Sequence, residues 1–217
     1  MNDSIMQAVQ RLNQQLPLKD RQDKLSAPLK ALHRAVLSTL VTRGRPPTRA
    51  EVAALVGEDQ VDGAIARLGA DDLVVVSADR REILGAYPVT AEKTPHEVHV
   101  NGHQIHAMCA LDALSVGPMY DVPVEICSAC RVSGEAVCIK QEGARILEAT
   151  PSTTRVGVRW QYPSGDHAAH SMCMEMVFLK DDATAAGWHG GDLQNHTVFT
   201  LEDAVQFGAR FFIPLLA

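Results

Sequence analysis

A thiol and a carboxylate lie three residues apart in an apolar stretch of this chain. Cys109 and Asp112 belong to the segment IHAMCALDALSVGPMYD, residues 105–121. Its helix-forming run, from Ala107 to Leu114, predicts a helix on which the two side chains share one face. A carboxylate among apolar neighbours requires a partner or a chemical role. The pair could therefore exchange a proton, although a structural cysteine beside a capping aspartate remains the alternative.

The other cysteines offer a second kind of chemistry. Cys127 and Cys130 form a CxxC motif, Cys138 follows eight residues later, and Cys173 lies in the apolar run SMCMEMVFL. A structural zinc site uses four ligands and commonly pairs two CxxC motifs, and this chain has only one. The motif therefore favours a turn with buried thiols over a zinc site completed by histidines.

Composition places the chain among ordinary globular proteins. Of its 217 residues, 46% are hydrophobic and 21% charged. No apolar run reaches about 18 residues, so we expect no membrane association. The polar N-terminal segment does not resemble a signal peptide. We therefore expect a cytoplasmic protein whose cysteines are reduced thiols.

The distribution of charge argues against nucleic-acid binding. The formal net charge is −6. Residues 1–86 contain 12 basic and 11 acidic side chains, and the remainder contains 8 and 15. Neither part has the basic surface that a DNA-binding domain needs, so we expect no nucleic-acid partner.

The first 86 residues predict a helical unit. Residues 1–27 form an N-terminal helix or extension, with apolar side chains at helical spacing before Pro17. Residues 28–86 predict three helices and a β-hairpin, the second helix starting at a capping box, Thr48 to Glu51. This order is winged-helix-like. The expected third helix, DQVDGAIARLG, has two aspartates against one arginine, which favours a structural role over DNA reading.

Residues 96–217 predict a domain of short mixed strands with flanking helices. Asn101-Gly102 marks a hairpin, around which His99, His103 and His106 are expected at the surface or in caps. Further strands are expected at 136–139, 145–149, 155–160 and 171–179, and helices at 183–188 and 201–212. The fold class is therefore α+β, with the winged-helix-like unit preceding this second domain.

Several of these segments resemble the organomercurial lyase (alkylmercury lyase) family. The resemblance rests on CALDAL at 109–114, on CRVSGEAV at 130–137 and on SMCMEMVFL with Trp188 downstream, and it covers roughly residues 29–208. Two positions depart from the family pattern. Met108 stands where an aromatic residue often precedes the first cysteine, and Met174 where many members have another cysteine. Both would alter the pocket wall.

The resemblance implies that the chain cleaves carbon–mercury bonds by protonolysis. Cys109, Asp112 and Cys173 would be the catalytic and mercury-binding residues, and Cys130 would be structural. No cofactor would be required. Hg(II) would be the bound product, and small thiols or a mercuric reductase would accept it.

Elementary chemistry agrees with this assignment. Thiolates are the soft protein ligands that suit mercury. The departing carbon needs a proton, which Asp112 could deliver as a general acid, since an apolar site favours its protonated form. Two non-catalytic alternatives remain: a metal-sensing winged-helix regulator, and a related fold that only binds a soft metal such as copper.

Overall fold

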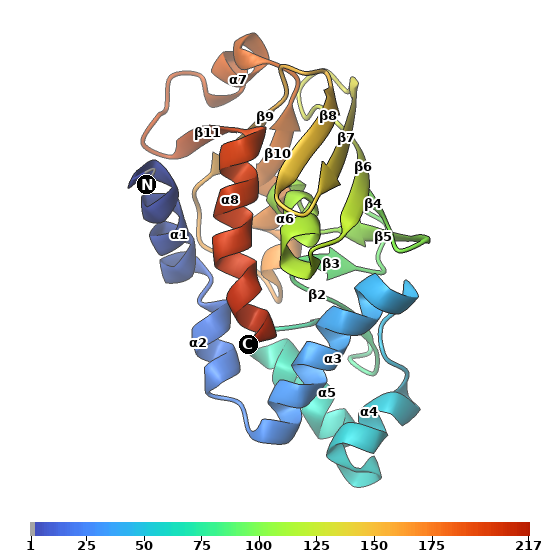
Figure 1. The fold of residues 1–217 in the computed structure, drawn as a ribbon. Coiled ribbons are helices and arrows are strands. Elements are labelled where there is room, and N and C mark those ends of the chain that lie inside the picture. Colours follow the sequence, from blue (N-terminus) through green and yellow to red (C-terminus); the bar gives the residue numbers. More distant parts are fainter. Residues whose placement is uncertain (1–2) are drawn as a thin grey trace.

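The structure is a computed structural model, described here for residues 3–217, and it has the expected α+β class. An eight-stranded antiparallel sheet and a separate three-stranded sheet account for all the strands of the described chain. Figure 1 shows helices α3, α4 and α5 gathered at one end of the molecule, and α8 running beside α6. No helix among the described residues is both long and apolar enough to cross a membrane.

The N-terminal elements follow the sequence pattern closely. They are α1 (Asp3–Gln15), α2 (Leu18–Asp23), α3 (Ala27–Arg43), α4 (Arg49–Val56), the 3₁₀ turn η1 (Glu58–Gln60) and α5 (Val61–Ala70). Helix α4 begins with the expected capping box, in which the side chains of Thr48 and Glu51 each bond the other's backbone amide. Helix α3 ends at Gly44, whose φ of 67° is easily adopted only without a side chain.

The larger sheet continues from the N-terminal unit into the rest of the chain. Its strands are β1 (Val75–Val76), β2 (Ile83–Ala86), β3 (Val89–Thr90), β4 (His96–Val100), β5 (His103–Ala107), β6 (Pro123–Ala129), β7 (Ala136–Glu142) and β8 (Arg145–Thr150). They are ordered β1-β2-β3-β5-β4-β6-β7-β8. The β1–β2 hairpin expected from the sequence is present, but β3 joins it directly to β5.

The C-terminal third supplies the smaller sheet and helix α8, which packs on α6 and α1. Its elements are β9 (Arg155–Arg159), η2 (Ala168–His170), η3 (Cys173–Glu175), β10 (Met176–Leu179), α7 (Asp182–His189), β11 (His196–Thr200), α8 (Leu201–Phe212) and η4 (Ile213–Leu216). Strand β9 lies between β10 and β11. Helix α8 begins and ends where the sequence predicted.

Close packing of two helices encloses the core. Helix α6 (Ala110–Tyr120) is buried along nearly its whole length, including Ser115. Helix α8 approaches it at Gly208, where an added Cβ would meet the Ser115 hydroxyl. A larger residue there would have to displace the Ser115 hydroxyl, so glycine permits the close approach. Helix α1 in turn packs on α8, with Ile5 and Leu12 buried as its helical spacing predicted.

Three sequence expectations about element boundaries were wrong. Residues 171–175 are not strand, because two short 3₁₀ turns precede β10, which starts only at Met176. Helix α6 starts at Ala110, since Ala107 still pairs in β5. The same helix continues through Pro118 to Tyr120, beyond Leu114, where the predicted helix ended.

Candidate active site

Cys109 and Asp112 are brought together by the start of α6. Cys109 is the residue before the helix, with an extended backbone (φ −154°, ψ 178°), and Asp112 occupies the third helical position. The Asp112 backbone N–H donates to the Cys109 sulfur at 3.3 Å. The thiol therefore acts as a helix cap, in the position where a serine or aspartate oxygen commonly lies. The predicted proximity is correct, but capping geometry creates it, not a shared helix face.

Cys173 reaches the same point from a distant part of the chain. It opens the 3₁₀ turn η3, immediately before β10. The sulfurs of Cys109 and Cys173 and a carboxylate oxygen of Asp112 all lie within 4.8 Å of one another. The three residues are buried, with exposed fractions of 0%, 3% and 2% respectively. This is the only such group of potential metal ligands among residues 3–217.

Asp112 is a buried carboxyl group without a cationic partner. No ion pair reaches it in the described part of the chain, and its Oδ2 has no hydrogen-bond partner there. Burial raises its pKa from 3.8 to about 7, although hydrogen bonds from the two thiols oppose the shift. A carboxyl group with this pKa can both accept and release a proton near neutral pH.

The two thiols differ in their surroundings. Burial raises the pKa of Cys109 well above its usual range. A hydrogen bond from Cys109 lowers the pKa of Cys173, but burial and the carboxylates of Asp112 and Asp72 outweigh it, so the net shift is upward. Both sulfurs are therefore protonated at neutral pH, and a ligand that binds thiolates must displace protons.

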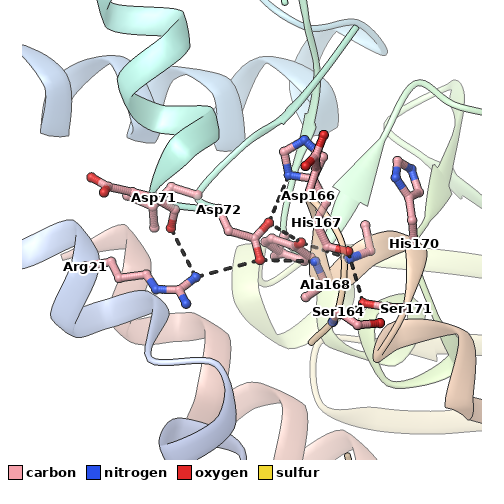
Figure 2. A network of polar contacts seen from close by, with 12 residues as sticks. Arg21, Asp71, Asp72, Ser164, Asp166, His167, Ala168, His170 and Ser171 are labelled. Atoms are coloured by element: carbon pink, nitrogen blue, oxygen red, sulfur yellow. Dashed lines mark hydrogen bonds and ion pairs between the residues drawn. The ribbon is translucent and has the colours of Figure 1, made fainter. Parts of the chain in front are cut away.

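A polar network holds the irregular segment that precedes Cys173 (Figure 2). At its centre lies Asp72, which is buried and adopts a positive φ of 50° just after α5. Its carboxylate accepts hydrogen bonds from the Tyr87 hydroxyl at 2.8 Å and from the backbone N–H of Ala168 at 3.1 Å. His167 Nδ1 lies 3.1 Å from the same carboxylate.

Two further contacts complete the network. The Tyr87 hydroxyl accepts a bond from the Ala169 N–H at 2.9 Å. Arg21 of α2 lies 3.7 Å from the Asp72 carboxylate and donates to the backbone carbonyl of Asp71. Figure 2 shows Asp72 between Arg21 on one side and the chain at His167 and Ala168 on the other. The N-terminal unit thereby fixes the segment that carries the second cysteine.

A pocket of about 440 Å³ is lined by the residues next to both cysteines in the sequence, although Cys109, Asp112 and Cys173 do not themselves line it. Met108 and Met174, the neighbours of the two cysteines in sequence, line it together with His96, Cys130 and Phe178. The wall is mainly apolar, which suits an organic group. Met108 and Met174, the two positions expected to alter the pocket wall, thus both line the pocket.

The CxxC motif does not form the turn that we predicted. Cys127 is half-buried within β6, while Cys130 follows the strand and is buried. Cys127 instead lies directly opposite Cys138 of β7. Burial by itself raises the pKa of Cys130, but the Ser133 hydroxyl and nearby backbone amides lower it overall.

Asp72 and Tyr87 were not predicted from the sequence. Neither residue lies near a cysteine in the sequence. Asp72 follows a helix, where a polar residue usually indicates only a turn. A weak signal was Asp71-Asp72 ahead of the buried run Leu73 to Val75, since one of two adjacent acids must lie close to the core. His99, His103 and His106 are exposed or half-buried, and the latter two bond backbone groups, as expected.

Comparison with known proteins agrees with this geometry. The alkylmercury lyase family model (MerB) matches residues 89–213. The alkylmercury lyase of Streptomyces lividans is 28% identical over 186 residues, which cover 83% of this chain and 81% of that protein. That of Staphylococcus epidermidis is 27% identical over 180 residues, covering 79% and 77%.

A solved structure shares the fold. The crystal structure of the mercury-bound form of MerB2 superimposes with a TM-score of 0.77 and 20% identity, covering 92% of this chain and 98% of that one. The family match extends over more than half of the sequence and includes Cys109, Asp112 and Cys173. The chain therefore belongs to the alkylmercury lyase family.

Proposed function

We propose that this protein is an enzyme that cleaves the carbon–mercury bond of organomercurials, releasing a hydrocarbon and leaving Hg(II). The observation that carries the proposal is the buried group of two thiols and one unpaired carboxyl within 4.8 Å. Membership of the alkylmercury lyase family supports it.

The three side chains can perform the reaction with every atom accounted for. One thiol loses its proton to Asp112 as its sulfur bonds to the mercury of R–Hg⁺. The second sulfur bonds to the same mercury and raises the electron density on the carbon. The carbon–mercury electron pair then takes the proton from Asp112, giving R–H and Hg(II) held by Cys109 and Cys173. The second thiol's proton leaves to solvent.

The arrangement explains why burial serves the chemistry. In an apolar site, the pKa of Asp112 is about 7, so near neutral pH the carboxylate can take the proton of a thiol and then deliver it to carbon. A salt-bridged carboxyl group would be ionised and unable to protonate carbon. We expect no resident cofactor. External small thiols, or a mercuric reductase, would remove the tightly held Hg(II).

A headspace assay tests this function. Purified protein is incubated with methylmercury and excess small thiol, and methane is measured by gas chromatography. We expect more than one methane per protein molecule and accumulation of thiol-bound Hg(II). Stoichiometric binding of methylmercury without methane would contradict the proposal and favour a binding protein.

We further propose that residues 28–86 are a winged-helix-like unit with a structural role, that 1–27 are an N-terminal extension and that 96–217 are the catalytic domain. Arg43, Arg45 and Arg49 of this unit are paired with Glu51 or Asp62, which leaves little free positive charge for phosphates. Gel-shift at low salt should therefore detect no appreciable DNA binding. Tight binding that responds to mercury would favour the regulator instead.

A further inference from the structure

Two cysteines outside the active site face each other across neighbouring strands. Cys127 of β6 and Cys138 of β7 are directly opposite partners in the antiparallel register. Cys127 directly follows the fully buried Ile126, and Cys138 directly precedes the fully buried Ile139. Because side chains alternate along a strand, both thiols lie on the face of the sheet that points away from this core. Cys138 is exposed and Cys127 half-buried, so small solutes can reach the pair.

The spacing of such a pair suits a bridging metal ion. Directly opposite residues of an antiparallel pair have Cβ atoms roughly 4.5–5.5 Å apart. A disulfide draws the Cβ atoms to roughly 3.5–4.5 Å, and both cysteines are free thiols here. Two sulfurs bound on opposite sides of one soft ion stand about 4.6–5 Å apart, at roughly 2.3–2.5 Å per bond. The cross-strand geometry accommodates this distance without backbone movement.

The number of ligands selects the kind of ion. No third histidine, cysteine or carboxylate of residues 3–217 joins this pair in a compact ligand group. Structural zinc takes four ligands, so two thiols alone do not make a zinc site. Hg(II) is soft and is satisfied by two thiolates in line. A monovalent organomercurial needs only one thiolate, so a dithiol favours Hg(II) over the substrate.

Surrounding charges also favour a cation. Burial, the Cys138 thiol and the carboxylates of Glu125 and Glu97 raise the pKa of Cys127. These carboxylates disfavour a free thiolate, but they attract a positive ion that takes the proton's place. The nearby cation, Lys140, is paired with Glu148 at 3.0 Å.

We propose that Cys127 and Cys138 form a second, surface site for Hg(II), separate from the catalytic group. Binding joins one Hg(II) to both sulfurs and releases their two protons to solvent, with no change in oxidation state. The choice of Hg(II) rests on the proposed function, since this ion would be the reaction's product. The site would retain product after external thiols had removed it from Cys109 and Cys173.

Mercury counting in the presence of a competing monothiol tests the site. Fully reduced protein is desalted without oxygen and mixed with two equivalents of Hg(II) chloride and two equivalents of glutathione, which compete with single thiols but are too few to strip a chelating pair. Retained mercury is then counted by native mass spectrometry. We expect two Hg(II) per wild-type chain, and one in Cys127→Ser or Cys138→Ser. The single-serine variants should bind mercury at the surface at least ~100-fold more weakly, because chelation supplies the second thiol at high effective concentration.

Matched variants separate this site from other thiols. Cys130→Ser removes a cysteine that has no facing partner and should still retain two Hg(II). Cys109→Ser with Cys173→Ser should retain one, whose X-ray absorption spectrum shows two sulfur neighbours. Retention of one Hg(II) by wild type, or of two by Cys127→Ser, would overturn the proposal. Circular dichroism melting verifies that each variant is folded.

The outcome is independent of catalysis. Hg(II) counting needs no carbon–mercury cleavage, and the methane assay needs no surface site. If wild type retained two Hg(II) but released no methane, the surface site would stand and the lyase function would fall. Methane release with only one retained Hg(II) would remove the surface site and leave the lyase function intact.

Discussion

The two halves of the catalytic group are built in different ways. Cys109 and Asp112 lie within one short element, and a backbone hydrogen bond of 3.3 Å from the Asp112 amide fixes their proximity. Cys173 belongs to an irregular segment whose position depends on Asp72 and Tyr87. These two side chains bond backbone amides that lie 96 and 82 residues further along the chain. One half is set by local structure, whereas the other depends on the packing of the whole chain.

This difference explains what each half contributes and how it can be disturbed. A helix start with a buried cap is rigid, so it suits the proposed proton carrier, Asp112, whose distance from the leaving carbon would have to be held to a fraction of an ångström. An irregular segment held by a few polar contacts opens more easily. The buried site has to admit substrate from the pocket beside Met108 and Met174, and the Cys173 side is the half with less regular structure.

Removing either sulfur should have the largest effect. Cys109→Ser and Cys173→Ser should each abolish methane release from methylmercury, because one thiolate leaves the carbon–mercury bond intact. Headspace gas chromatography measures the rate, with Cys127→Ser as a control that retains single-turnover activity. Residual turnover in only one of the serine variants would show that the two halves are not equally required.

Weakening the polar network should disturb only the Cys173 half. Asp72→Asn replaces an acceptor of several hydrogen bonds by a group that also donates, so we expect a stability loss of about 2 kcal/mol. Hydrogen exchange at Ala168 and Ala169 should accelerate, while exchange at the Asp112 amide should not. Methane release should slow by about tenfold.

The adjacent acid provides a matched control for that variant. Asp71 pairs through its side chain with Arg67 in an exposed position, at 2.7 Å. Asp71→Asn should therefore cost less than ~1 kcal/mol and leave activity and exchange unchanged. Equal effects of the two substitutions would show that Asp72 has no special role in holding the segment.

The Asp112 half should reveal itself in the pH dependence of stability. Its folded-state pKa, about 7, lies above the unfolded value of 3.8, so its protonated form stabilises the fold. This contribution is complete below about pH 4 and is lost as pH rises through 7. The free energy of unfolding of Asp112→Asn, relative to that of wild type, should therefore rise by roughly 3 kcal/mol from pH 5 to pH 8. Denaturant unfolding at both values measures it, and a constant difference would exclude a raised pKa.

The comparison also explains what the sequence could predict. The residues from Cys109 to Leu114 carry their own pattern, so the thiol–carboxylate pair and its burial were predicted correctly. Helix α8 and the capping box of α4 were equally local and equally well predicted. The order of helices and hairpin in residues 28–86 was also correct, whereas continuity of the sheet through β3 depends on distant pairing.

The Cys173 side could not be predicted in the same way. The apolar run at 171–179 has a strand pattern, but the backbone N–H groups of Ala168 and Ala169 donate to Asp72 and Tyr87 in the turn before it, and the strand begins only at Met176. The pairing of Cys127 with Cys138 likewise depends on the register of β6 against β7, about which the CxxC spacing gives no information. In both cases long-range contacts override the local pattern.

One measurement tests the central claim most directly: the single-turnover rate of methane release by Asp112→Asn. This variant keeps the size and polarity of the side chain and both sulfurs, but it has no proton to transfer. We predict that it binds one equivalent of methylmercury as wild type does, yet releases methane at least ~100-fold more slowly, the usual contribution of general acid–base catalysis. Release at close to the wild-type rate would contradict the account, because the proton would then come from a thiol or from water.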